Sequence, residues 1–223
     1  MAQVAFDLDG TLVDSRADLA EATNHVLRSF GLPSIAPETV YGYVGDGARA
    51  LVERALGPER AALYDEGVRR FLAHYREHLL DATRPYPGIV ALLETLHARG
   101  VVLTVLTNKP EDLSRRILDG LGLGRWLAAI VGGDTLSSRK PDPAGVSHLR
   151  ASFDTPADAM LLVGDSPVDF ETARRAGIAF CGVAWGLVPE RLRAAGPATM
   201  IHEPGDLGVL VERGFPLRGA RSD

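Results

Sequence analysis

The sequence predicts an α/β fold: a Rossmann-like, three-layer core built on a parallel sheet, with an inserted all-helical cap domain. Three observations predict it. From residue 86 onward, short β-branched apolar runs alternate with helical patterns, which is typical of a parallel sheet with helices on both faces. The apolar run at 3–7 needs that same sheet for its partners. Between these two parts, residues 16–82 show one helical pattern after another and no strand pattern.

The position of the helical stretch predicts two domains. Residues 1–15 and 83–223 form the expected catalytic core, and residues 16–82 form the expected cap. Two linkers, near Ser15 and near Arg84-Pro85, join them. An insertion after the first strand covers the sheet edge where ligands of open parallel sheets bind. The cap is therefore expected to act as a lid.

The individual helices and strands are predicted from the spacing of apolar residues and from the glycines and prolines that flank them. Helices are read from apolar residues at intervals of three and four, with glycine or proline at their ends. Strands are read from short apolar runs such as 101–106, which has the character of a strand buried on both faces. The expected cap elements are helices over 15–31, 48–56 and 58–81. The expected core elements are helices over 87–100, 111–121, 143–153 and 168–176, and strands over 3–7, 101–106, 128–131, 160–163 and 178–183.

Composition narrows the class of protein. The formal net charge is −5 and no basic run occurs, so nucleic acid is not an expected partner. The single cysteine, Cys181, excludes a disulfide within the chain and fits a reducing compartment. No apolar run reaches membrane-spanning length, and the first strand begins too early for a signal peptide. We expect a cytoplasmic protein without membrane contact; monomer and homodimer both stay open.

The first strand ends in two carboxylates, Asp7 and Asp9, with one residue between them. In an extended chain, residues two apart point to the same face, and two like charges there repel unless a cation lies between them. Gly10 allows the chain to turn sharply where the strand stops. An ordinary turn that closes a buried strand is the alternative reading, and an isolated Asp-Gly would favour it.

Other polar residues follow the later strands, and parallel strands bring their carboxyl ends to one edge. Thr107 and the amides after it can hold an anion, and Lys140 can direct an ammonium group inward. Asp165 and Asp169, with Asp7 and Asp9, supply oxygen ligands suited to Mg²⁺. Taken singly, these residues also fit a helix cap, a surface lysine and surface acids. Their agreement predicts a shared site.

These segments together resemble the four motifs of the haloacid dehalogenase superfamily of phosphotransferases. Asp7-Leu8-Asp9-Gly10-Thr11 matches the first motif without departure. Thr107 resembles the second motif, Lys140 the third, and Gly164-Asp165-Ser166 with Asp169 the fourth. The resemblance covers the whole core and implies a phosphate-transferring enzyme that uses Mg²⁺.

The resemblance also implies a role for each residue. Asp7 is the expected nucleophile, which forms an aspartyl-phosphate. Asp9 is the expected acid and base, and Lys140 neutralises Asp7 and the phosphate, so these three form the catalytic set. The expected metal site comprises Asp7, Asp165 and the backbone carbonyl of Asp9, with Asp169 supporting the metal or the lysine. The expected substrate-binding residues are Gly10, Thr107, Asn108 and Lys140.

The segment 44–56 in the cap resembles the lids of phosphoglycolate phosphatases. Gly45 and Gly47 allow the lid to approach the substrate, and Arg49 or Arg54 can pair with a substrate carboxylate. A solvent-facing helical arginine is the alternative for each. The expected function is therefore Mg²⁺-dependent hydrolysis of a small phosphate monoester, with 2-phosphoglycolate favoured. A phosphatase or phosphomutase acting on sugar phosphates, or a pyrophosphatase, is the alternative with the same core chemistry.

Two other classes of protein compete with this interpretation. A non-enzymatic binding module could keep the fold, but the presence of Asp7, Asp9, Lys140 and Asp165 together favours an enzyme. A response-regulator-like receiver also uses a phosphate-accepting aspartate on a parallel sheet. The long helical insert after the first strand does not suit a receiver.

Overall fold

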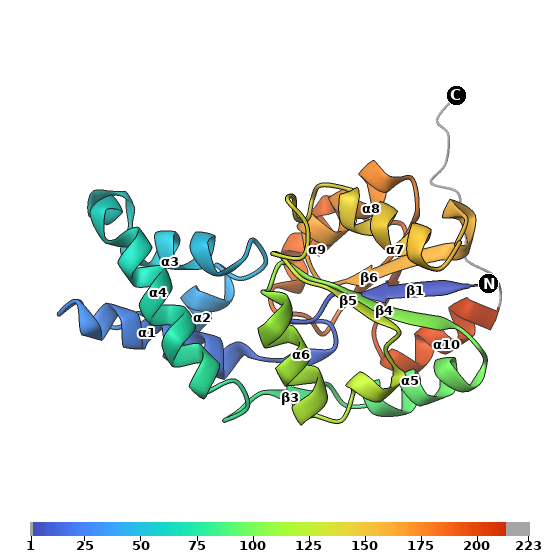
Figure 1. The fold of residues 1–223 in the computed structure, drawn as a ribbon, viewed down its shortest axis with the longest axis horizontal. Helices are drawn as coiled ribbons and strands as arrows, with labels where there is room; N and C mark the ends of the chain where they lie inside the picture. Colours follow the sequence, from blue (N-terminus) through green and yellow to red (C-terminus); the bar gives the residue numbers. More distant parts are fainter. Residues whose placement is uncertain (1, 213–223) are drawn as a thin grey trace.

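The computed structural model describes residues 2–212 of the chain, so the last part of the expected core range lies outside the described residues. The core contains a six-stranded sheet in the order β5-β4-β1-β6-β7-β8, and all neighbouring strands are parallel (Figure 1). The strands are β1 (Gln3–Phe6), β4 (Val102–Leu106), β5 (Ala129–Val131), β6 (Met160–Gly164), β7 (Ala179–Val183) and β8 (Met200–Ile201).

Helices cover both faces of this sheet. On one face, α5 (Ile89–Ala98), α6 (Glu111–Gly120) and α10 (Pro204–Glu212) pack on one buried apolar cluster. On the other face, α7 (Ala144–Ser152) and α8 (Pro167–Ala176) pack on a second cluster (Figure 1). β1 is buried along its whole length because it is central and covered on both sides. The predicted three-layer α/β fold is confirmed.

The predicted strands and core helices agree with the observed ones to within about one residue at most ends. The last strand, β8, the short helix α9 (Pro189–Ala195) and the last helix, α10, were not predicted. β8 has only two residues, too few to show alternation or an apolar run. It is held by pairing with β7, a contact that no local pattern indicates.

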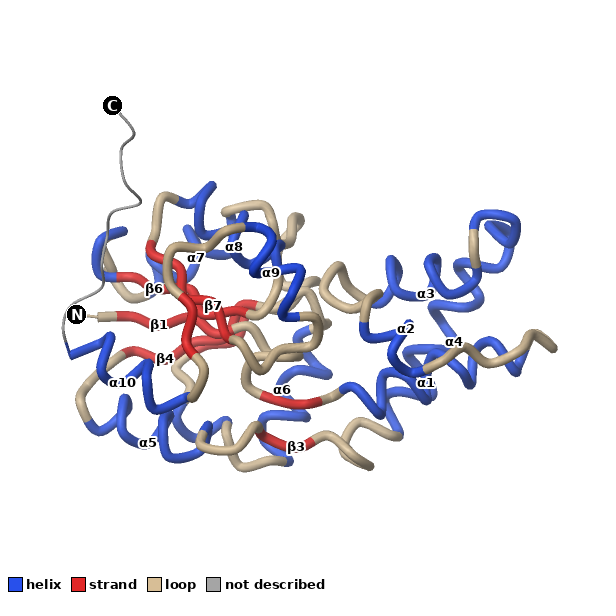
Figure 2. Tube along the Cα trace, turned by 180° about the vertical axis from the view of Figure 1, so that it is seen from behind, coloured by secondary structure: helices blue, strands red, loops and turns tan. Residues whose placement is uncertain are grey.

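The cap consists of α1 (Arg16–Ser29), α2 (Pro37–Tyr41), α3 (Ala48–Leu56), the 3₁₀ segment η1 (Pro58–Leu63) and α4 (Tyr64–Glu77). These elements form a separate helical group beyond one edge of the sheet (Figures 1 and 2). The predicted single helix over 58–81 is wrong: the backbone leaves helical geometry at Arg60, and α4 begins only at Tyr64. No residue of η1 is buried, so packing does not hold it in line with α4.

Two short strands mark where the chain passes between core and cap. β2 (Val13–Asp14) pairs antiparallel with β3 (Arg84–Pro85). Just beyond them, the buried carboxylate of Asp18 accepts hydrogen bonds from the backbone of Ala82 and from both the backbone and the hydroxyl of Thr83, the latter at 2.6 Å. These bonds join the two passages, and they support 16–82 as our proposed extent of the cap.

Among residues 2–212, no helix has both the length and the apolar character needed to cross a membrane.

Candidate active site

The register of the sheet explains how the site forms. Phe6, the last residue of β1, lies opposite Val105 of β4 and Val163 of β6. The residues that follow these strands therefore emerge at one edge. They include Asp7, Thr107 and Asp165, and all three are buried.

Lys140 reaches this edge from the loop between β5 and α7. Its ammonium group lies 2.8 Å from Oδ1 of Asp7 and 2.6 Å from Oδ1 of Asp169, and its side chain is only 2% exposed. Burial alone would lower the pKa of Lys140, but the carboxylates of Asp169 and Asp7 outweigh burial and raise it. The lysine is thus a fixed positive charge beneath the expected nucleophile.

The acids at this edge outnumber that single charge. Burial, opposed by Lys140 and assisted by Asp169, raises the pKa of Asp7 to about 6. Burial together with the charges of Asp7 and Asp169 raises the pKa of Asp165 well above its usual range. A raised pKa of a carboxyl group means that its ionised form lacks compensation. The group of three acids is therefore short of positive charge.

This deficit fits a divalent cation. One carboxylate oxygen from each of Asp7, Asp165 and Asp169 lies within 4.8 Å of the others. An all-carboxylate group of this kind matches the oxygen ligands that Mg²⁺ prefers. Asp169 is the least available of the three, because Oδ1 accepts from Lys140 and Oδ2 accepts from the amide and the hydroxyl of Ser166 in a capping box at the start of α8. Its position favours the expected support of the lysine.

Gly10 and Asp165 are packed closely. Gly10 has a φ of +86°, and a Cβ atom there would overlap the carboxylate of Asp165. Thr11, the next residue, donates its hydroxyl to Oδ1 of Asp165 at 3.4 Å. Gly10 is thus required both for the turn after β1 and for the space that Asp165 occupies. Gly10 therefore lies at the site, where its backbone packs against the carboxylate of Asp165.

The spacing of Asp7 and Asp9 predicted that their side chains share one face, but the side chain of Asp9 lies apart from the carboxylate of Asp7 and from the other acids. β1 ends at Phe6, and the side chain of Asp9 turns to Lys109, whose ammonium lies 2.6 Å and 2.8 Å from its two oxygens. Ser15 donates its hydroxyl to Asp9 Oδ1 at 2.5 Å. The carboxylate of Asp9 is therefore outside the group of acids that could hold a metal.

Lys109 and Tyr75 are the residues that the sequence interpretation missed. Besides Asp9, the ammonium of Lys109 donates to the hydroxyl of Tyr75 at 2.7 Å. Neither residue was among the expected catalytic, metal-binding or substrate-binding residues. A usable signal existed: a lysine directly after Thr107-Asn108 at a strand end lies near the acids of the first strand.

Thr107 and Asn108 lie between the core edge and the cap. The Asn108 side chain donates to the carbonyl of Gly45 in the cap and to that of Lys140 in the core, both at 3.0 Å. A Cβ atom at Gly47 would lie 3.2 Å from the Asn108 carbonyl oxygen, so this loop also approaches closely. Gly45 and Gly47 are therefore brought to the site with Thr107 and Asn108.

A cleft of about 280 Å³ lies between the cap and the core. Arg54 lines it, held by Asp46 and by the carbonyl of Tyr43, whereas Arg49 does not line it. Arg49 is exposed and pairs with Glu53 at 2.8 Å and with Asp65. The residues of the expected site that line the cleft are Asp7, Asp9, Gly45, Gly47, Thr107, Asn108 and Asp165.

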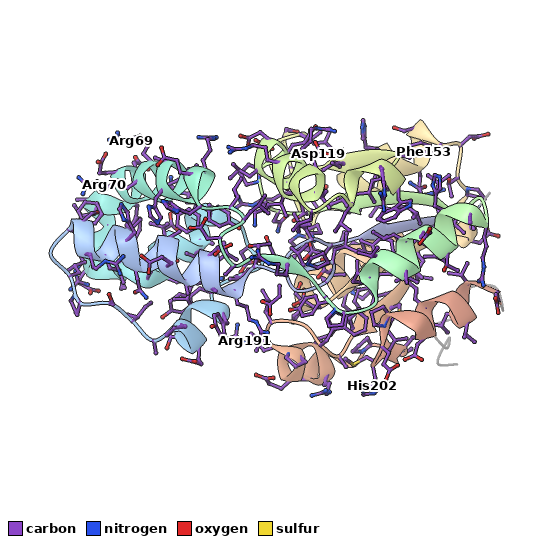
Figure 3. All side chains as sticks on the ribbon, turned by 90° about the horizontal axis from the view of Figure 1, so that it is seen from below. Arg69, Arg70, Asp119, Phe153, Arg191 and His202 are labelled. Atoms are coloured by element: carbon purple, nitrogen blue, oxygen red, sulfur yellow. The ribbon has the colours of Figure 1, made fainter. Side chains whose placement is uncertain are left out.

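A second arginine of the cleft comes from the core. Arg191 of α9 donates to the carbonyl of Gly42 in the cap at 2.7 Å, and Figure 3 shows it at the junction of the two parts. Among the described residues, Arg191 forms no ion pair with a carboxylate. Its charge is available to the cleft.

The fold and the site together define a capped α/β enzyme with acids and lysines at the carboxyl edge of a parallel sheet. The chain belongs to the haloacid dehalogenase-like hydrolase family, whose model matches residues 4–183. The expected family, and with it the expectation of a hydrolytic enzyme, is confirmed. Family membership also excludes the response-regulator-like receiver.

Similar proteins within the family share one description, phosphoglycolate phosphatase. The chain is 41% identical to a phosphoglycolate phosphatase of Rhodospirillum rubrum over 97% of this chain and 92% of the relative. It is 38% identical to a phosphoglycolate phosphatase of Aquifex aeolicus over 95% of this chain and 97% of the relative. A crystal structure described as a predicted phosphoglycolate phosphatase from Haemophilus somnus has a TM-score of 0.88 and 30% identity, covering 95% of this chain and 98% of that one.

Proposed function

We propose that this protein is a Mg²⁺-dependent phosphatase that hydrolyses a small phosphate monoester, with 2-phosphoglycolate favoured, through an aspartyl-phosphate on Asp7. One observation carries the proposal. The buried carboxylate of Asp7 lies 2.8 Å from Lys140, beside Asp165, and lines a cleft that Asp9 also lines. The names of the relatives at 38–41% identity support the choice of substrate.

In the first step, an oxygen of Asp7 forms a bond to phosphorus while the bond from phosphorus to the leaving oxygen breaks. Asp9 gives its proton to that oxygen, so that an alcohol leaves. Thr107 and the amide of Asn108 hold the phosphoryl oxygens, and Lys140 offsets the charge of Asp7. When bound, Mg²⁺, held by Asp7, Asp165 and the backbone carbonyl of Asp9, supplies positive charge between two anions that otherwise repel.

In the second step, Asp9 takes a proton from water, and the oxygen of that water bonds to phosphorus. The bond between phosphorus and Asp7 breaks, which releases inorganic phosphate and restores the carboxylate. Covalent catalysis thus replaces one difficult displacement with two easier ones. Asp9 serves as acid and then as base, so its side chain must face the cleft in both steps.

The cations of the cleft support a substrate with a second negative group. Arg54 and Arg191 both line the cleft, and they come from opposite sides of it. An arginine recognises a carboxylate through paired hydrogen bonds. Of the two cap arginines left open by the sequence, the geometry favours Arg54 over Arg49. Arg191 is a further candidate, which the sequence did not suggest.

The direct test compares kcat/KM for 2-phosphoglycolate, sugar phosphates and pyrophosphate, with Mg²⁺ and after chelation. We expect 2-phosphoglycolate to be preferred by about 10-fold or more, because a site built for a carboxylate leaves charge unpaired with other esters. Activity should disappear with the chelator. A flat profile would reject 2-phosphoglycolate, and full activity in the chelator would reject the role of the metal.

Matched variants separate recognition of the carboxylate from catalysis. Arg54→Gln and Arg191→Gln are assayed with 2-phosphoglycolate and with ethyl phosphate, which lacks the carboxylate. If one of these arginines binds the substrate carboxylate, its variant should lose activity on 2-phosphoglycolate and keep activity on ethyl phosphate. Arg49→Gln, outside the cleft, is the control and should leave both activities unchanged.

A further inference from the structure

One buried polar contact joins a side chain of the cap to the acid of the active site. Tyr75, on α4 of the cap, is 1% exposed, and its hydroxyl accepts a hydrogen bond from Lys109 at 2.7 Å. The same ammonium binds both oxygens of Asp9. Lys109 is itself 7% exposed. The cap, the lysine and Asp9 therefore form one continuous chain of contacts.

The choice of residue at position 109 is informative. The sequence has 24 lysines and arginines together, and only two of them, Lys109 and Lys140, are lysines. Both are buried at the site, and each holds one aspartate of the first motif. An ammonium on a flexible stem can pair closely with one carboxylate in a confined space, where the planar guanidinium of arginine demands a wider geometry.

The hydroxyl of Tyr75 has no other partner among the residues that the structure describes. Its ring already packs against Phe71, with 5.5 Å between ring centroids, and the ammonium of Lys109 lies 4.7 Å from the ring centroid. A phenylalanine would fill the same space and keep both contacts. What tyrosine adds at this position is the polar contact to Lys109.

We propose that Tyr75 and Lys109 are positioning residues that orient Asp9, so that the acid and base of the reaction is aligned only while the cap lies against the core. The proposal rests on the proposed function, in which Asp9 handles the proton. With Tyr75 in place, the ammonium is fixed from two sides. Without the hydroxyl of Tyr75, the long, flexible side chain of Lys109 loses one of its two partners. The ion pair of Lys109 with Asp9 is then less well fixed, and Asp9 is no longer held in one orientation.

The test is a double-mutant cycle on the full-length protein with Mg²⁺ and 2-phosphoglycolate or an aryl phosphate. Tyr75→Phe should lower kcat by about 10-fold with KM within about 2-fold, and Lys109→Met should lower kcat by about 100-fold, since misplacement of a catalytic group costs up to this amount. The double variant should match Lys109→Met alone, because the hydroxyl acts only through the lysine.

Arg76→Met is the matched control. Arg76 is also on α4 and also joins the cap to the core, through Asp112 at 3.0 Å, but this pair is exposed and does not lead to Asp9. It should leave kcat unchanged. If Tyr75→Phe behaves like Arg76→Met, or if the effects of Tyr75→Phe and Lys109→Met add, the positioning role is wrong.

Two further measurements keep the outcomes distinct. A wild-type protein without phosphatase activity would overturn the proposed function itself, whereas an active wild type with a neutral Tyr75→Phe overturns only the positioning role. If Lys109→Met does not fold, Lys109→Arg takes its place, since it keeps the charge and changes the geometry. Tyr75→Phe should then have no further effect on kcat in that background.

Discussion

Replacement of Asp7 by asparagine should abolish turnover, lowering kcat by about 10⁴-fold or more, as expected when a covalent nucleophile is removed. The amide keeps the shape of the side chain but cannot form the aspartyl-phosphate. The measurement is steady-state hydrolysis of 2-phosphoglycolate and of an aryl phosphate. Asp119→Asn, an exposed position on α6, is the control and should retain full activity.

The same variant should not lose stability in the absence of metal. Burial raises the pKa of Asp7 to about 6, so the folded protein binds a proton more tightly than the unfolded chain. The ionised carboxylate therefore lowers stability as pH rises from about 4 to above 6. Asparagine carries no such charge. With chelator at pH 7.5, Asp7→Asn should melt at or above the wild type; a clear fall in Tm would contradict the charge deficit inferred for the site.

Removal of Lys140 should have the second large effect. Lys140→Met leaves Asp7 and Asp169 buried without their common cation, and breaking a buried pair in this way typically costs about 3–5 kcal/mol. The loss in kcat should be about 10²-fold or more, because the charge on Asp7 is no longer offset. Urea unfolding in chelator and steady-state kinetics measure the two effects.

The pH dependence of the free energy of unfolding identifies why Lys140→Met loses stability. In Lys140→Met, Asp7 and Asp169 stay buried but lose their common cation, and Asp7, whose pKa is already raised, takes up a proton as pH falls. The loss of stability should therefore be larger at pH 8 than at pH 5. The double variant Lys140→Met/Asp169→Asn, which removes one of the stranded charges, should recover part of the stability. Equal losses at both pH values would mean that packing, and not charge, explains the effect.

Much of the core site was predictable because it depends on few rules. The strands are short, apolar and buried, and parallel strands end at one edge. Knowledge of where β1, β4 and β6 end was therefore enough to predict that Asp7, Thr107 and Asp165 approach each other. Each of these residues follows directly after its strand, so its position can be predicted from the neighbouring residues in the sequence.

The contacts between cap and core were not predictable in the same way. Tyr75 shows the spacing of an inner helical residue, and nothing local indicates that its hydroxyl meets Lys109. That contact depends on how α4 sits over the core, which is a tertiary property. The same holds for the arginines: Arg49 and Arg54 lie five residues apart on α3, and the packed structure places Arg54 along the cleft and Arg49 outside it.

The most direct measurement is to trap the covalent intermediate. Asp9→Asn should be phosphorylated by an aryl phosphate, whose good leaving group needs little help from an acid, and then hydrolyse slowly for lack of a base. After acid quench and proteolysis, mass spectrometry should find phosphate on the peptide that contains Asp7. Phosphate on a different residue, or hydrolysis by a variant that lacks the Asp7 carboxylate at the wild-type rate, would contradict the assignment of Asp7 as the nucleophile.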